Sequence, residues 1–195
     1  MKELLKYTIF RTSWGCFGLL GTESCLCRTC LPLPDREKAQ AHLLNNLSHL
    51  KRNASPAGYE ESKVGQQGYR LQLDKSFFQP LQEEIAAYFD GVRVDFSPEI
   101  PLALSGLTHF ARSVLAACRK VSFGQTTSYS GLAKTLGRPS GARAVGNTLA
   151  RNPLPLIIPC HRVLRSDGGM GGFSAAGGPN VKRKMLELEQ QAPTV

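Results

Sequence analysis

The chain has 195 residues, of which 42% are hydrophobic, and a formal net charge of +9, enough to bury the core of one large or two small domains. No apolar run approaches the roughly 20 residues that span a bilayer, and the charged N-terminus lacks the apolar core of a secretory signal. We expect a cytoplasmic protein (nuclear in a eukaryote) without a membrane partner. Its six cysteines are too few and too unevenly spaced for a disulfide scaffold.

The first hundred residues alternate between strand and helix patterns. In chain order they predict two short strands joined by a tight turn over 4–30, a helix over Asp35 to Leu50, a loop over 51–69, a helix over Gln79 to Asp90 ended by Gly91, and a short strand over Val92 to Phe96. The segment Pro98 to Pro101 is typical of a linker. We therefore place a boundary near residue 100, between an N-terminal α/β domain (1–100) and a C-terminal domain (101–195).

A cysteine cluster within this first half raises the question of a metal. Cys25, Cys27 and Cys30 lie within six residues, a spacing that could hold a soft metal such as zinc. Only one CxxC is present, without a second CxxC or an HxxxH, so His42 or His49 would have to complete the site. We favour three reduced, partly buried thiols and predict no cofactor, with zinc as the alternative.

The positive charge is confined to the second half. From Arg112 onward 12 Lys and Arg residues face three acidic residues, a net of +9, whereas before it 12 basic residues meet 12 acidic ones. This asymmetry indicates that the C-terminal half meets a polyanion. A solvated basic face that only serves solubility would give the same pattern.

The second half is mostly helical, with a pair of short helices at its centre. The predicted elements are a helix over Thr108 to Lys120, a turn at Phe123 to Gln125, a helix over Tyr129 to Leu136 capped by Ser128, and a helix over Gly141 to Arg151 capped by Ser140. The last two helices form a helix-turn-helix pattern. The second of them is built from small residues around Arg143, which favours a close approach to a minor groove or backbone over major-groove reading by long polar side chains. Close packing against its own core is the alternative.

A reactive thiol is indicated at residues 159–162. Pro159-Cys160-His161-Arg162 follows the apolar run Asn152 to Ile158, which is typical of a buried strand. Cysteine is a nucleophile only as the thiolate, and a neighbouring imidazole or cation lowers its pKa. This tetrapeptide predicts covalent chemistry at Cys160 on a negatively charged partner.

The motifs of the second half together resemble the O6-alkylguanine-DNA alkyltransferase family. The resemblance runs from about Phe110 to Glu189 and rests on Ser128-Tyr129, Ala142-Arg143-Ala144-Val145-Gly146, Arg151-Asn152-Pro153, Ile157 to Val163 and Val181 to Glu189. It implies an α/β (α+β) fold, with a small ribonuclease-H-like antiparallel sheet and helices in the first domain and a mostly helical second domain with a helix-turn-helix. It also implies a monomer that repairs duplex DNA.

The resemblance implies a role for each site residue. Cys160 accepts the alkyl group from O6-methylguanine, and from O4-methylthymine, once and irreversibly; His161 acts through a water as its base, Glu189 orients His161, and Asn152 braces the turn. The target nucleotide must be flipped out of the duplex. Toward the DNA the resemblance assigns Tyr129, Ser130, Arg143 and Ser166, and to the base pocket Pro155, Phe173 and Ser174.

Two departures from the family pattern stand in this pocket. The usual tyrosine is Phe173, which lacks a hydroxyl, and the stretch Ser174 to Pro179 is about two residues longer than usual. Two other classes of function remain open. An alkyltransferase-like module recognises damage without transfer but lacks the acceptor cysteine, and a cysteine hydrolase or thiol redox protein would use the same Cys160-His161 pair. A transcription factor would need a further DNA-binding domain, for which the N-terminal half has neither the charge nor the motif.

Overall fold

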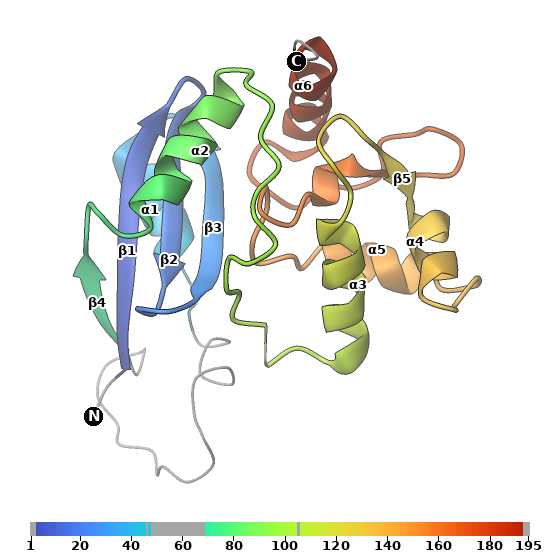
Figure 1. Ribbon diagram of the computed structural model, residues 1–195, viewed down its shortest axis with the longest axis horizontal. Coiled ribbons are helices and arrows are strands. Elements are labelled where there is room, and N and C mark those ends of the chain that lie inside the picture. Colours follow the sequence, from blue (N-terminus) through green and yellow to red (C-terminus); the bar gives the residue numbers. More distant parts are fainter. Residues whose placement is uncertain (1–2, 46, 48–68, 105, 193–195) are drawn as a thin grey trace, which may run out of the picture.

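A four-stranded sheet forms one side of the molecule (Figure 1). The computed structural model describes residues 3–45, 47, 69–104 and 106–192. Strands β1 (Glu3–Thr12), β2 (Gly15–Gly21) and β3 (Leu26–Leu33) are antiparallel, and β4 (Tyr69–Leu73) pairs in parallel with β1, in the order β3-β2-β1-β4. The antiparallel sheet is confirmed, but residues 4–30 hold parts of three strands where we predicted two. Gly15 closes the first turn with a φ of 130°, a conformation that disfavours any side chain.

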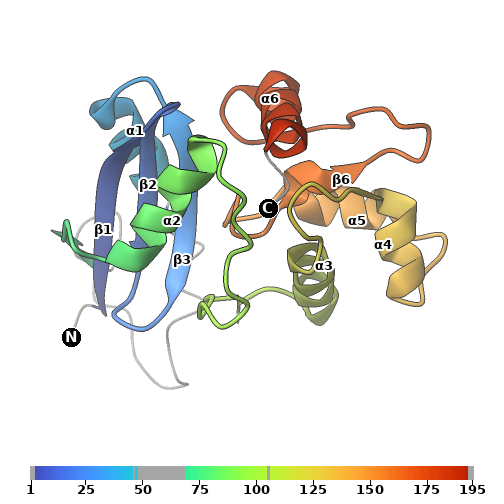
Figure 2. The ribbon, with the colours of Figure 1, turned by 45° about the horizontal axis from the view of Figure 1, so that its top comes forward.

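Each face of the sheet has its own cover. Helix α1 (Arg36–Leu44) packs on one face over Leu5, Ile9 and Leu20. Helix α2 (Gln79–Phe89) and the C-terminal half pack on the other, where one core includes residues from both halves, among them Phe17, Leu19, Ile85, Leu115 and Ile157 (Figures 1 and 2). The predicted helix over Gln79 to Asp90 is confirmed. The helix expected over Asp35 to Leu50 begins as predicted, with Asp35 accepting from the Lys38 N–H at 2.7 Å, but ends at Leu44; most of its remaining residues, like 51–68 of the predicted loop, lie outside the described part.

The segment between the halves is irregular, and the strand predicted over Val92 to Phe96 is wrong. A strand needs a neighbour for its backbone groups. This segment is instead held by single contacts: the Asp95 carboxylate accepts from the Phe123 N–H at 2.7 Å. Further on, Leu26 at the start of β3 donates to the Pro101 carbonyl at 2.8 Å and accepts from the Ala103 N–H at 2.9 Å. The predicted linker thus lies along an edge strand of the sheet.

The C-terminal half consists of short helices and two very short strands. Its elements are α3 (His109–Arg119), β5 (Thr127–Ser128), α4 (Tyr129–Thr135), α5 (Ala142–Leu149), β6 (Val163–Leu164), which pairs in parallel with β5, and α6 (Gly178–Gln191). Ser128 caps α4 as predicted, accepting from the Gly131 N–H at 2.9 Å. Ser140 does not cap α5, because a tight turn closed by the Gly141 N–H on the Arg138 carbonyl puts Gly141 at that position.

The run before the PCHR tetrapeptide is buried but is not the strand that its apolar residues predicted. Pro153 and Pro155 have no N–H for a ladder, and Leu156 has a φ of 79°, which turns the chain. A single bridge joins Pro155 and Ile158. Residues Cys160–Arg162 then form one turn of 3-10 helix. No helix in the described part of the chain is long and apolar enough to cross a membrane.

Candidate active site

Cys160 lies at the start of this 3-10 turn, and its side chain is held by Asn152. The Asn152 amide nitrogen donates to the Ile158 carbonyl at 2.8 Å and to the Cys160 sulfur at 3.2 Å, while its oxygen accepts from the Leu154 N–H at 3.0 Å. One amide therefore fixes both ends of the turn and the position of the sulfur. Cys160 is only 8% exposed, so its sulfur is reached only through the cavities that it lines.

His161, the residue that follows Cys160, forms a buried pair with Glu189. His161 Nε2 lies 2.7 Å from Glu189 Oε1, with the two side chains 0% and 1% exposed. A carboxylate can only accept, so the neutral imidazole carries its proton on Nε2 and presents Nδ1 as an acceptor. Nδ1 is buried and has no hydrogen-bond partner among the described residues. The imidazole is thus oriented by Glu189 and keeps a free basic nitrogen.

Glu189 is held by three further groups. Arg162 donates from Nε to both oxygens, at 3.1 and 3.0 Å, and from Nη2 to Oε1 at 3.0 Å. The Tyr88 hydroxyl donates to Oε1 at 2.8 Å, and the Gly124 N–H donates to Oε2 at 3.0 Å. Sequence reasoning missed Tyr88 and Arg162. Arg162 stands within the PCHR tetrapeptide, whereas no local pattern could have linked Tyr88 to a glutamate 101 residues away.

The charges of this cluster decide its protonation. Burial would raise the pKa of Glu189, but its hydrogen bonds and charge interactions with His161 and Arg162 lower it to about 2. Burial lowers the pKa of His161. The charges of Arg162 and Lys182 lower it further, whereas Glu189 raises it. Burial likewise raises the pKa of the Cys160 thiol, although the Asn152 hydrogen bond and the charge of Lys182 act against it. The resting site therefore contains an ionised glutamate, a neutral imidazole and a protonated thiol.

Lys182 is a second buried cation that sequence reasoning did not single out. It lies on α6, is 0% exposed, and donates from Nζ to the Val163 carbonyl at 2.6 Å. Nζ also lies 5.7 Å from the centre of the Tyr129 ring. Burial lowers the pKa of Lys182, while the charges that Cys160 and Cys118 carry as thiolates raise it. A buried ammonium beside the thiol stabilises a thiolate more strongly than the same charge would in water.

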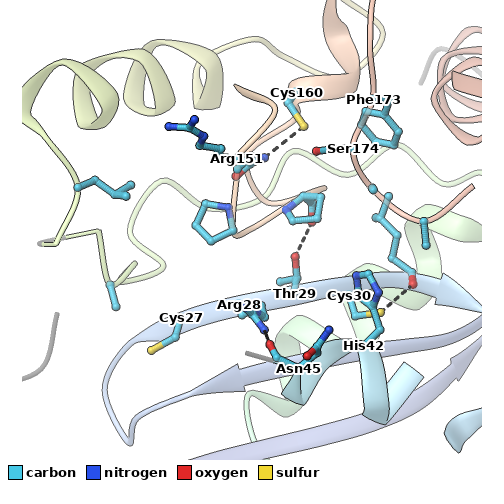
Figure 3. A pocket seen from close by; sticks show the side chains of 18 of the residues that line it. Cys27, Arg28, Thr29, Cys30, His42, Asn45, Arg151, Cys160, Phe173 and Ser174 are labelled. Carbon is cyan, nitrogen blue, oxygen red and sulfur yellow. Dashed lines mark hydrogen bonds between the residues drawn. The ribbon is translucent and has the colours of Figure 1, made fainter. Parts of the chain in front are cut away.

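Two cavities meet at Cys160. The helix-turn-helix cavity, of about 620 Å³, is lined by Tyr129, Ser130, Arg143, Ser166, Phe173 and Ser174 among others. It brings together all four predicted DNA contacts and two of the three base-pocket residues. The third, Pro155, lines instead the sheet-side cavity of about 790 Å³, which Phe173 and Ser174 also reach. In Figure 3 the residues Arg28, Thr29, Cys30 and His42 lie across this cavity from Cys160 and Ser174.

The longer stretch after Phe173 is anchored to the helix-turn-helix. The Ser174 hydroxyl donates to the Ala150 carbonyl at 2.6 Å, directly after α5. Phe173 is half-buried and packs against the core. Helix α6 begins at Gly178, within the Ser174 to Pro179 stretch, and carries Glu189 to within 2.7 Å of His161 Nε2.

The cysteines considered for zinc do not form a metal site in the described residues. No three His, Cys, Asp or Glu side chains come close enough there to hold an ion, and His49 lies outside them. Burial raises the pKa of Cys27 to about 11 and that of Cys30 to about 12, so both are protonated thiols near neutral pH.

Comparison with known proteins gives one consistent result. Residues 109–191 match the family model described as the 6-O-methylguanine DNA methyltransferase DNA-binding domain. The chain is 36% identical over 158 residues to a methylated-DNA–protein-cysteine methyltransferase of Methanosarcina barkeri, covering 81% of this chain and 89% of the relative. It is 35% identical over 125 residues to the inducible one of Bacillus subtilis, covering 64% and 67%.

Solved structures extend the likeness to the whole fold. The O6-methylguanine methyltransferase of Mycobacterium tuberculosis superposes with a TM-score of 0.71 at 27% identity, over 98% of this chain and 96% of that one. Mycobacterium tuberculosis OGT in complex with DNA gives 0.70 at 27% identity, over 97% and 96%.

Proposed function

The chain belongs to the methylated-DNA–protein-cysteine methyltransferase family, and from this premise we propose that it transfers the alkyl group of O6-methylguanine in duplex DNA to its own Cys160. Transfer from O4-methylthymine belongs to the same proposal. The observation that carries it is the placement of Cys160: it lines one cavity together with Tyr129 and Arg143 of the helix-turn-helix, and the next residue, His161, is paired with Glu189.

The reaction is an in-line displacement at the alkyl carbon. Because the thiol rests protonated, a base must remove its proton before or during attack. His161 Nδ1 is the free basic nitrogen, and it acts on the thiol through a water. The sulfur–carbon bond forms as the carbon–O6 bond breaks, and the thiol proton ends on the guanine, which leaves as the normal base. The thioether carries no leaving group for a second step, so the protein acts once.

Three groups stabilise the charges that develop on sulfur and on His161 as the thiol loses its proton. Asn152 donates to it at 3.2 Å, Lys182 brings a buried positive charge, and Glu189 supports the imidazolium that forms on His161. Donors that are already oriented before the reaction need no reorganisation during it. This arrangement supports a single methyl transfer and not multiple turnovers, because none of these groups has a proposed role in removing the alkyl group from sulfur.

The DNA side of the proposal rests on α4 and α5. Arg143 is exposed at the start of α5 and lines the same cavity as Cys160. The small residues Ala142 and Gly146 line that cavity too and allow close approach to a minor groove. We infer that the lesion is flipped into the cavity, since a stacked base cannot reach the sulfur of a residue that is only 8% exposed. Arg143 then fills the vacated stack. Tyr129, Ser130 and Ser166 contact the backbone around it, and the protein acts as a monomer.

The test is incubation with duplex DNA that contains one O6-methylguanine, followed by intact-protein and peptide mass spectrometry. We expect one methyl per protein, on Cys160, saturating at one equivalent, and none in Cys160→Ser. Undamaged duplex is the control for nonspecific labelling. Multiple turnovers, or a lesion that persists without any mass gain, would overturn the proposal.

A further inference from the structure

Tyr88 comes from the N-terminal half and contacts the His161–Glu189 pair, which together with Cys160 forms the proposed proton relay. It lies in the last turn of α2, and its side chain is completely buried. Three aromatic rings surround its own: Phe89 and Phe123 edge-on, with centroids 5.1 and 5.8 Å away, and Phe96 at 6.2 Å. Because such packing leaves the ring one orientation, the position of its hydroxyl is set by the core and not by the hydroxyl's own hydrogen bond.

The hydroxyl is directed at the oxygen that orients the catalytic histidine. It donates to Glu189 Oε1 at 2.8 Å and lies 3.5 Å from His161 Nε2. The same Oε1 accepts from His161 Nε2 at 2.7 Å and from Arg162 Nη2 at 3.0 Å. One carboxylate oxygen offers about two lone pairs, so these donors share its charge. Each donor therefore weakens the pull of Oε1 on the others.

We propose that Tyr88 is a positioning residue of the relay: its hydroxyl keeps the Glu189 carboxylate as an acceptor facing Nε2 of His161 and limits how strongly that carboxylate draws the Nε2 proton. The inference rests on the proposed function of Cys160 and His161. Without the hydroxyl, Oε1 becomes a stronger acceptor and His161 more basic. A larger share of His161 is then protonated, and useless as a base, at mildly acidic pH.

Few other groups can produce a pH effect at this histidine. The charged or titratable groups that face it are Glu189 and Lys182 from α6, Arg162 and Cys160 from its own turn, and Tyr88 from α2. Burial and the negative charge of Glu189 raise the pKa of Tyr88 well above its usual value. The phenol consequently stays protonated, and a donor, over the range in which His161 titrates.

The experiment compares Tyr88→Phe with Tyr69→Phe in the protein of 195 residues. Tyr69 is a matched control, because its hydroxyl is also buried but has no hydrogen-bond partner within the described residues, and it packs in the other core, on the α1 face of the sheet. The first readout is the ¹⁵N and ¹H spectrum of the unreacted, histidine-labelled protein. The second is the pH dependence of single-turnover methyl transfer.

In Tyr88→Phe we expect the Nε2–H proton of His161 to move downfield, as its hydrogen bond to Glu189 strengthens. The acid limb of the transfer rate should move up by about half a pH unit. Tyr69→Phe should match the wild type in both. If Tyr88→Phe only lowers thermal stability and leaves both readouts unchanged, Tyr88 is structural and the inference fails. If the wild type transfers no methyl, the proposed function fails, while the histidine spectrum still tests the Tyr88 contact.

Discussion

At the scale of single residues, the site depends on a thiol that rests in its unreactive form. Burial raises the pKa of Cys160 and lowers that of His161, so proton transfer between them has to accompany the attack. The protonated resting state makes Cys160 selective for DNA over small alkylating agents in solution, because a protonated thiol reacts slowly with them. Lys182 is the nearby cation that offsets part of the cost of burial.

Lys182→Met should therefore weaken the nucleophile. Removing this charge raises the thiol pKa further, and we expect the reactivity of Cys160 near neutral pH to fall about tenfold. The measurement is the pH dependence of iodoacetamide labelling of Cys160, read by peptide mass spectrometry. Lys184→Met is the control, since Lys184 lies on the same helix but is exposed and stacks on Trp14 at 3.9 Å. Equal labelling rates for both variants would show that Lys182 does not act on the thiol.

At the scale of elements, the sequence located α2 to α5 well and the irregular segments badly. Ser128 caps its helix as predicted, and Thr108, where the next predicted helix begins, caps α3, because a side chain three residues away satisfies one of the first N–H groups locally. The runs Val92 to Phe96 and Asn152 to Ile158 carry strand residues without a strand beside them. Whether an apolar run becomes a strand depends on partners that are distant in sequence.

The helix-turn-helix formed by α4 and α5 predicts that Arg143 contributes to DNA binding and not to the reactivity of Cys160. Arg143→Ala should slow methyl transfer from O6-methylguanine duplex by at least about tenfold, because the unstacked position is no longer filled. Iodoacetamide labelling of Cys160 should stay at the wild-type rate. Arg70→Ala, which removes an exposed arginine from β4, controls for net charge. A Cys160 that labels slowly in Arg143→Ala would instead mean a damaged site.

At the scale of the whole molecule, the two halves are joined at the active site itself. The β3 edge is bonded to the loop before Cys160, with the Thr29 N–H and hydroxyl donating to the Pro153 and Pro155 carbonyls at 3.0 and 2.7 Å. Glu189 collects donors from both halves. The Glu189 carboxylate therefore stabilises the contact between the two halves, in addition to orienting His161.

Acid should unfold the protein through Glu189. Its pKa is about 2 in the fold against 4.5 as a reference, so its contribution is complete above pH 4.5 and is lost as the pH falls toward 2. His161 adds a second loss of stability. Because burial lowers its pKa in the fold, the unfolded chain binds a proton more readily once the pH falls below its usual pKa of 6.5. We expect the free energy of unfolding, followed in urea by Trp14 fluorescence, to fall between pH 4.5 and 2. In Glu189→Gln it should start lower and change less over that range; a parallel decline would contradict the assignment.

The sequence by itself located the candidate nucleophile and indicated DNA as the partner. Cys160 and His161 are adjacent, the helix-turn-helix follows local capping and turn rules, and the charge asymmetry needs only a count. Only the tertiary structure decided how the nucleophile is controlled: Tyr88, Gly124 and Lys182 reach the site from separate elements. The physical reason is that protonation in a buried site depends on the donors and charges packed around it, and local sequence patterns carry no record of which distant side chains those are.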